Sequence, residues 1–184
     1  MEIILMPIAA GIMFAIISAI LKIIFKLLFK LLSNGRKTGE IYYPNGNIRG
    51  RAELNKYNQL DGEEKIFYEN GEIKAIRYWK NNKLNGKYEE FYENGNLESE
   101  FPYTNGSING IVKIFYDNGN IKSRTPVKND VIWGIVENYY MNGKLKSKVS
   151  YINGVEKEVL ESYNELGEKE KKLDLDSLLN RKNK

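Results

Sequence analysis

Six glycines recur at a nearly fixed spacing, and this period constrains the fold more than any other feature of the chain. Successive members stand 25, 24, 24, 24 and 24 residues apart. Four of them are the last residue of similar five-residue segments, FYENG, FYENG, FYDNG and YYMNG. The six are Gly46, Gly71, Gly95, Gly119, Gly143 and Gly167. A fixed period of this length predicts a repeat protein, in which each unit is one supersecondary element that cannot bury its apolar surface alone.

The residues around these glycines predict β-hairpins. An Asn-Gly pair between two β-prone runs is the strongest short hairpin signal, and it predicts a type I′ turn with positive φ at both central residues. Each 24-residue unit is therefore expected to hold a strand, an Asn-Gly turn, a return strand and a looser connection with a second glycine. Those second glycines are Gly62, Gly86, Gly110 and Gly134.

Two aromatic residues precede most of the turns, as in Phe67-Tyr68. Because neighbours along a strand face opposite sides, the Phe column and the Tyr column should line different faces. We expect the Phe column, with the Ile/Leu column after the turn, to be the better buried, and the tyrosine hydroxyls to stay in water. Pro102 and Pro126 share one column on the return strand. Proline lacks a ladder donor, so that strand should be broken or bulged there.

The composition argues against an enzyme. The chain contains neither cysteine nor histidine, which removes disulfides, thiolate nucleophiles, the commonest general base and the commonest transition-metal ligand. We therefore expect no catalytic residue, no metal and no cofactor. A carboxylate enzyme acting on an envelope polymer is kept as an alternative, because Glu63, Glu64, Glu89, Glu90 and Glu93 gather near the turns. The simpler interpretation of these acids is a solvated face in which they alternate with lysines.

The net charge of +4 is located entirely in residues 1–37, which carry five basic residues and one acidic residue. The rest of the chain is neutral and of mixed charge. Nucleic-acid affinity depends on clustered Lys and Arg that release counterions, so no nucleic-acid partner is expected. No small-molecule substrate is expected either.

Residues 3–21 form an uncharged, mostly apolar run of 19 residues, long enough for a helix to cross a bilayer. Lys22, Lys26 and Lys30 follow at steps of four and so form one narrow stripe, which is expected to anchor the helix among lipid headgroups. A cleavable signal peptide is the main rival, but the positive charge follows the apolar run instead of preceding it. A buried core helix is disfavoured because the segment is apolar all round. The positive flank predicts a single-pass membrane protein with cytoplasmic repeats.

The repeat columns resemble the MORN repeat in its bacterial variant, with the core G-x4-[F/Y]-Y-x-N-G-x-[I/L], over about residues 39–167. The resemblance implies an all-β fold, in which tandem antiparallel hairpins form an elongated, twisted single sheet, here preceded by an N-terminal transmembrane helix. It also implies a binding or scaffolding role. Many bacterial proteins with this variant resemble antitoxins. We divide the chain into an anchor (1–37), a repeat domain (38–170) and a charged tail (171–184), which is a short helix or a frayed end.

The leading functional hypothesis is a membrane-anchored, non-enzymatic module that binds an unidentified protein. Neutralisation of a cognate toxin is the alternative binding function. The candidate contact surface is an aromatic strip of the Tyr column, which presents rigid amphipathic side chains. The competing interpretation is that these aromatic residues only hold a thin sheet together across strands. The strip consists of Tyr68, Tyr92, Tyr116 and Tyr140.

Overall fold

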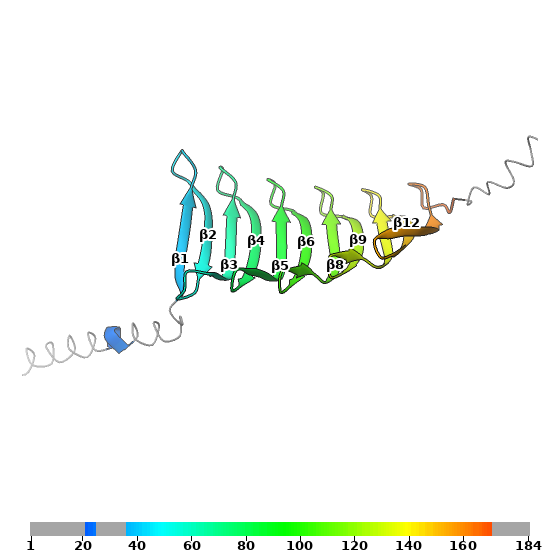
Figure 1. The fold of residues 1–184 in the computed structure, drawn as a ribbon. Helices are drawn as coiled ribbons and strands as arrows, with labels where there is room; N and C mark the ends of the chain where they lie inside the picture. Colours follow the sequence, from blue (N-terminus) through cyan, green and yellow to red (C-terminus); the bar gives the residue numbers. More distant parts are fainter. Residues whose placement is uncertain (1–20, 25–35, 171–184) are drawn as a thin grey trace, which may run out of the picture.

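In the computed structural model, which describes residues 21–24 and 36–170, the repeats form one open antiparallel sheet. Figure 1 shows the hairpins standing side by side in an elongated row, with the Asn-Gly turns along one edge. The described part of the sheet contains 13 strands, and neighbours in the chain are neighbours in the sheet. β7 and β10 are two-residue strands that pair with β6 and β9, beside the main path. The expected all-β sheet of tandem hairpins is confirmed.

The strands of the main path are six to nine residues long. They are β1 (Lys37–Tyr42), β2 (Ile48–Leu54), β3 (Leu60–Phe67), β4 (Ile73–Lys80), β5 (Lys83–Phe91), β6 (Leu97–Thr104), β8 (Gly110–Phe115), β9 (Ile121–Lys128), β11 (Gly134–Tyr139), β12 (Leu145–Ile152) and β13 (Val155–Ser162). The short strands are β7 (Ser107–Ile108) and β10 (Val131–Ile132).

The Asn-Gly turns are hairpin turns, but they are not of type I′. In the second unit, Gly71 has φ of 91°, whereas Asn70 is not among the residues with positive φ. The Gly71 N–H donates to Tyr68 O, the Tyr68 N–H donates to Glu72 O, and the strand register shifts at Phe67. This is a type I turn closed by a glycine bulge. The expectation of type I′ geometry was wrong here because the register shift at Phe67 leaves only the glycine with positive φ.

Type I′ geometry is found instead at the opposite edge of the sheet, where a looser connection was expected. The two central residues of the β4–β5 connection, Asn81 and Asn82, have φ of 49° and 61°. In Asn105-Gly106, Asn129-Asp130 and Asn153-Gly154, φ is likewise positive at both residues. The chain is thus a continuous meander with a turn at every strand connection. At the edge opposite the Asn-Gly turns, the five-residue β2–β3 loop is longer than the two-residue turns of the other units.

The proline strands run without interruption, and the break falls on the strand that follows. Pro102 lies within β6 and pairs with Lys87 of β5. The Pro102 carbonyl accepts a hydrogen bond from the N–H of Asn109, the residue that lies between β7 and β8. In an antiparallel strand the N–H and C=O of one residue point to the same side, so the missing proline donor faces this break. Pro126 and Trp133 repeat the arrangement between β9 and β10–β11.

The best-buried residues lie on one face of the sheet, here called face A, in the middle of the strands. They are small or β-branched: Ala75, Ser99, Val112, Val136 and Val149. The Phe column and the Ile/Leu column are only half-buried. The expectation that they form the best-buried set was wrong, because they lie at strand ends beside the turns, where fewer neighbours surround them. In the described part of the chain no large side chain is fully buried.

Most of the predicted membrane segment lies outside the described residues. Residues 21–24 are helical, and β1 begins at Lys37. Lys22 is exposed within that short helix, and Lys26 and Lys30 lie outside the described residues. Within the ranges 21–24 and 36–170, no helix combines the length and the apolar character that a bilayer crossing requires. The predicted tail, 171–184, also lies outside the described residues.

Candidate interaction surfaces

The predicted aromatic strip is built into the contacts between repeats. Each tyrosine of the column is half-buried, and its hydroxyl donates to a backbone carbonyl one repeat further along, at 2.7–2.8 Å. The donors Tyr43, Tyr68, Tyr92, Tyr116 and Tyr140 meet the carbonyls of Phe67, Phe91, Phe115, Tyr139 and Tyr163. The expectation that these hydroxyls stay in water was wrong.

Basic side chains cover most rings of this column. Lys74 Nζ lies 5.3 Å from the centroid of Tyr68, and Lys146 Nζ lies 5.4 Å from that of Tyr140. Partial desolvation raises the pKa of the Tyr68, Tyr92 and Tyr140 hydroxyls, with nearby carboxylates adding to it. Whether the exposed part of these rings also contacts a partner stays a prediction. Every hydroxyl has a structural partner, and so does one face of each ring of the strip except that of Tyr92.

A row of charged side chains crosses the opposite face, face B, at mid-strand. Its members lie directly opposite one another from β1 to β13, interrupted only by Ile76 of β4. The charged row is Glu40, Arg51, Lys65, Glu89, Glu100, Lys113, Arg124, Glu137, Lys148 and Glu161. Five acids and five bases make it neutral. Sequence reasoning missed it, because a row across a sheet becomes visible only when the register of every strand is known.

The centre of the charged row is tightly paired except at one position. Glu100 accepts from Lys113 at 2.9 Å and from Lys87 at 3.2 Å. The Lys113 hydrogen bond, with that of Lys87, lowers the pKa of the Glu100 carboxyl although burial opposes this. Arg124 is exposed and forms no ion pair with any described residue. Its guanidinium is therefore available to an external carboxylate.

Next to the charged row on face B lies a row of apolar side chains. Pro102, Ile111, Pro126 and Ile135 each stand two residues along the strand from a charged-row member, on four successive strands of the main path. Because the side-chain period of a strand is two, these four residues, the apolar row, share face B. Ile111 is 50% exposed and Ile135 47%. The backbone N–H of Trp133, a residue that is 51% exposed, donates to the Pro126 carbonyl.

Two glycines of the second-glycine column, Gly110 and Gly134, lie against prolines of this row. A Cβ at Gly110 would lie 2.9 Å from Cγ of Pro102, and one at Gly134 would lie 3.2 Å from Cγ of Pro126. Both glycines also have left-handed φ, 132° and 117°. Glycine thus lets each proline ring pack against the backbone of the next strand.

A network of charged and aromatic side chains lies on face A between β3 and β5. Trp79 Nε1 donates to Glu64 Oε2 at 2.9 Å, and Arg77 lies 3.5 Å from the same oxygen. Arg77 also stacks on Tyr88, with its Cζ 4.8 Å from the ring centroid, and the Tyr88 hydroxyl donates to Glu90. The predicted acids thus separate: Glu64 and Glu90 join this network, whereas Glu89 belongs to the charged row.

Four segments match the family model described as MORN repeat variant: residues 60–81, 84–105, 108–129 and 134–153. Each spans one Asn-Gly hairpin and most of the flanking strands. No curated protein matches the chain. The outer hairpin β1–β2 has the same form but lies outside the matched segments, and nothing in the match concerns a membrane anchor or an antitoxin, which stay predictions. We conclude that the chain is a repeat protein and that four of its units, in tandem within residues 60–153, are similar to the MORN repeat variant.

Proposed function

We propose that the chain is a non-enzymatic module that holds a protein partner against face B and is tethered to a membrane by its N-terminal segment. The observation that carries the proposal is the apolar row, bordered by the charged row and with both of its isoleucines about half exposed. Protein interfaces combine an apolar centre with a polar rim, and their binding energy concentrates in buried Trp, Tyr and Arg side chains. Isolated exposed apolar residues are normal, but a contiguous set marks a contact surface.

The charges beside the apolar row define the chemistry of the partner. Along the four strands the charged row has the order Glu100, Lys113, Arg124, Glu137. The acids at both ends are paired within the sheet, by Lys113 and by Lys148, whereas Arg124 is not. A matching protein surface presents apolar side chains to the isoleucines and prolines and a carboxylate to Arg124. A carboxylate–guanidinium pair of this kind adds orientation as well as affinity.

Affinity purification from native membranes tests the contact surface. The double variant Ile111→Thr/Ile135→Thr keeps β-branched side chains in the sheet and removes apolar surface from the row. Val159→Thr is the matched control, because Val159 is 39% exposed and pairs with Val149 on face A, away from the row. The amount of a partner that copurifies with the native protein and with the control should fall at least about tenfold with the double variant. Losing two interface side chains at ~1 kcal/mol each is enough to weaken binding by that factor.

Equal recovery of every partner with all three proteins, each shown to be folded by circular dichroism, would overturn face B as the contact surface. The tether is tested separately by washing membranes at alkaline pH, because a spanning segment resists extraction and a peripheral protein does not. Release into the supernatant would contradict the tether and leave the contact surface untouched. Protease treatment of sealed vesicles tests the cytoplasmic orientation, which digestion of the repeats from outside would contradict.

A further inference from the structure

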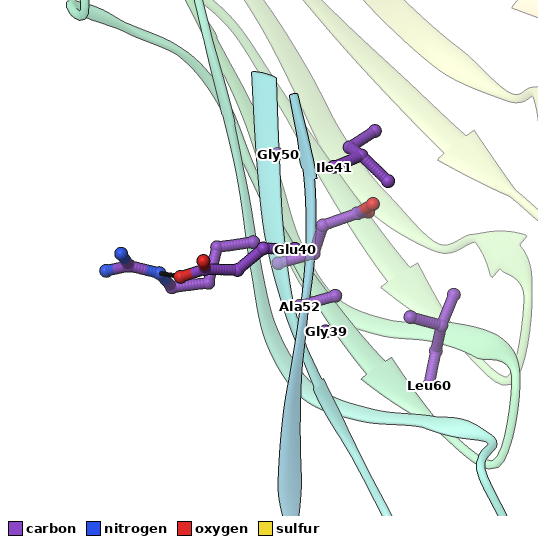
Figure 2. A pocket seen from close by; sticks show the side chains of 8 residues that line it. Gly39, Glu40, Ile41, Gly50, Ala52 and Leu60 are labelled. Carbon is purple, nitrogen blue, oxygen red and sulfur yellow. Dashed lines mark hydrogen bonds and ion pairs between the residues drawn. The ribbon is translucent and has the colours of Figure 1, made fainter. Parts of the chain in front are cut away.

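A pocket of about 260 Å³ opens on face A at the N-terminal end of the sheet, far along the row of hairpins from the apolar row and on the other face. It is lined by Gly39, Ile41, Gly50, Ala52, Leu60 and Glu64, and by Glu40 and Arg51, which form an ion pair with each other. Figure 2 shows Ile41, Ala52 and Leu60 on one side of the strands, with the ion pair of Glu40 on the other. Pockets for drug-sized molecules measure ~300–1,000 Å³, so this one suits a single side chain or a small ligand.

The pocket exists because small residues stand in columns that other repeats fill. The column of Gly39 holds Tyr88 two units later, and the column of Ala52 holds Arg77 and then Phe101. At Gly39 a Cβ would lie 3.4 Å from Leu54 Cδ1, an ordinary contact, and φ is not left-handed. Neither crowding nor backbone conformation therefore requires glycine at this position. The space is a feature of this hairpin and not of the repeat.

One carboxylate oxygen in the pocket has no partner. Glu64 pairs with Ala52 across β2 and β3, which places its side chain on face A. Its Oε2 is held by Trp79 and Arg77, whereas Oε1 makes no hydrogen bond or ion pair with the described residues. Arg77 is the one base of a network that also contains the carboxylate of Glu90, so the network carries a net charge of −1. A cation at Oε1 would neutralise it.

We propose that this pocket binds a primary alkylammonium group, presented as a lysine side chain by a partner protein. The aliphatic stem lies against Ile41 and Leu60, and the ammonium donates to Glu64 Oε1. A guanidinium fits less well, because it favours a carboxylate with both oxygens free. Trp79 and Arg77 fix the carboxylate before the ligand arrives, which lowers the ordering cost of binding. The site is separate from the apolar row, so each can fail without the other.

Methyl NMR of the full-length protein in a non-ionic detergent tests the site, with Nα-acetyl-lysine methylamide as the probe. The probe should shift the methyl signals of Ile41, Ala52 and Leu60 saturably, with a dissociation constant on the order of millimolar. The norleucine analogue has the same stem without the ammonium and should bind at least about tenfold more weakly. Phosphoethanolamine represents a lipid headgroup. If it binds as tightly as the lysine probe, the claim that the ammonium group comes from a partner protein is overturned.

Three variants separate charge from space. Glu64→Gln keeps an acceptor for Trp79 but removes the charge, and should weaken lysine binding at least about tenfold. Gly39→Val fills the pocket at a strand position and should abolish binding. Glu63→Gln, on face B of the same strand as Glu64 and outside the pocket lining, is the matched control and should bind as the native protein does. No saturable shift with the native protein, equal binding of the norleucine analogue, or unchanged binding in Glu64→Gln would each overturn the proposal.

Discussion

Removing one tyrosine hydroxyl should weaken the junction between two repeats by a predictable amount. Tyr92 donates to the Phe115 carbonyl at 2.8 Å from a half-buried position. The variant Tyr92→Phe keeps the ring and leaves that carbonyl without its side-chain partner, which should cost about 1 kcal/mol of unfolding free energy. Five such bonds link the repeats, so replacing all five tyrosines should cost roughly 5 kcal/mol, comparable to the whole stability of many domains.

Urea unfolding of the full-length protein in detergent measures the loss. Tyr57→Phe is the matched control, because Tyr57 is 70% exposed and its hydroxyl makes no hydrogen bond with the described residues. It should leave the free energy of unfolding within about 0.5 kcal/mol of the native value. Because repeat arrays can unfold in steps, amide exchange at Gly119, in the turn next to Phe115, gives a local readout and should accelerate in Tyr92→Phe alone. Indistinguishable results for the two variants would refute the junction role.

Three further predictions concern the backbone and the titrating groups. Gly110→Ala should destabilise by about 1–3 kcal/mol, because a proline ring occupies the Cβ position, whereas Gly71→Ala, strained but unobstructed, should cost only about 1 kcal/mol; thermal melts of both variants compare the two. The pKa of Tyr92 is raised in the folded state, so its protonated hydroxyl contributes stability below the unfolded pKa of about 10, and this contribution is lost as pH rises through the folded pKa. Above pH ~10 the free energy of unfolding should therefore fall more steeply with pH in the native protein than in Tyr92→Phe. The pKa of Glu100 is lowered in the folded state, so its carboxylate contributes stability at pH values above its ordinary pKa, and this contribution is lost as pH falls through the folded pKa. In Glu100→Gln the free energy of unfolding should therefore fall less steeply with decreasing pH. An unchanged slope would contradict the pairing with Lys113.

The repeat, the hairpins and the single sheet followed from the glycine period, because turn chemistry and period act locally along the chain. Turn type did not follow from the sequence. Asn70-Gly71 and Asn105-Gly106 contain the same dipeptide, yet only the second has positive φ at both residues. The difference arises from the register of the flanking strands, which a bulge shifts at Phe67. A dipeptide does not encode that register.

The candidate surfaces were less predictable than the fold. The Tyr column was visible as a motif, but its role required knowing that each hydroxyl meets a carbonyl in the next repeat. The prolines were singled out for a missing donor, and their position on face B beside Ile111 and Ile135 depended on strand pairing. The pocket is defined by what Gly39 and Ala52 lack. An absent side chain gives a sequence no positive signal until the neighbouring strands are placed.

Site-specific photocrosslinking in native membranes tests the central claim most directly. A photoreactive phenylalanine derivative placed at Ile135 would sit in the apolar row, and the same group at Val159 would be exposed on face A. If a partner protein docks on the apolar row, irradiation should yield a specific crosslinked band at position 135 and little at position 159. Crosslinking that is absent at both positions, or equally strong at both, would contradict docking on the apolar row.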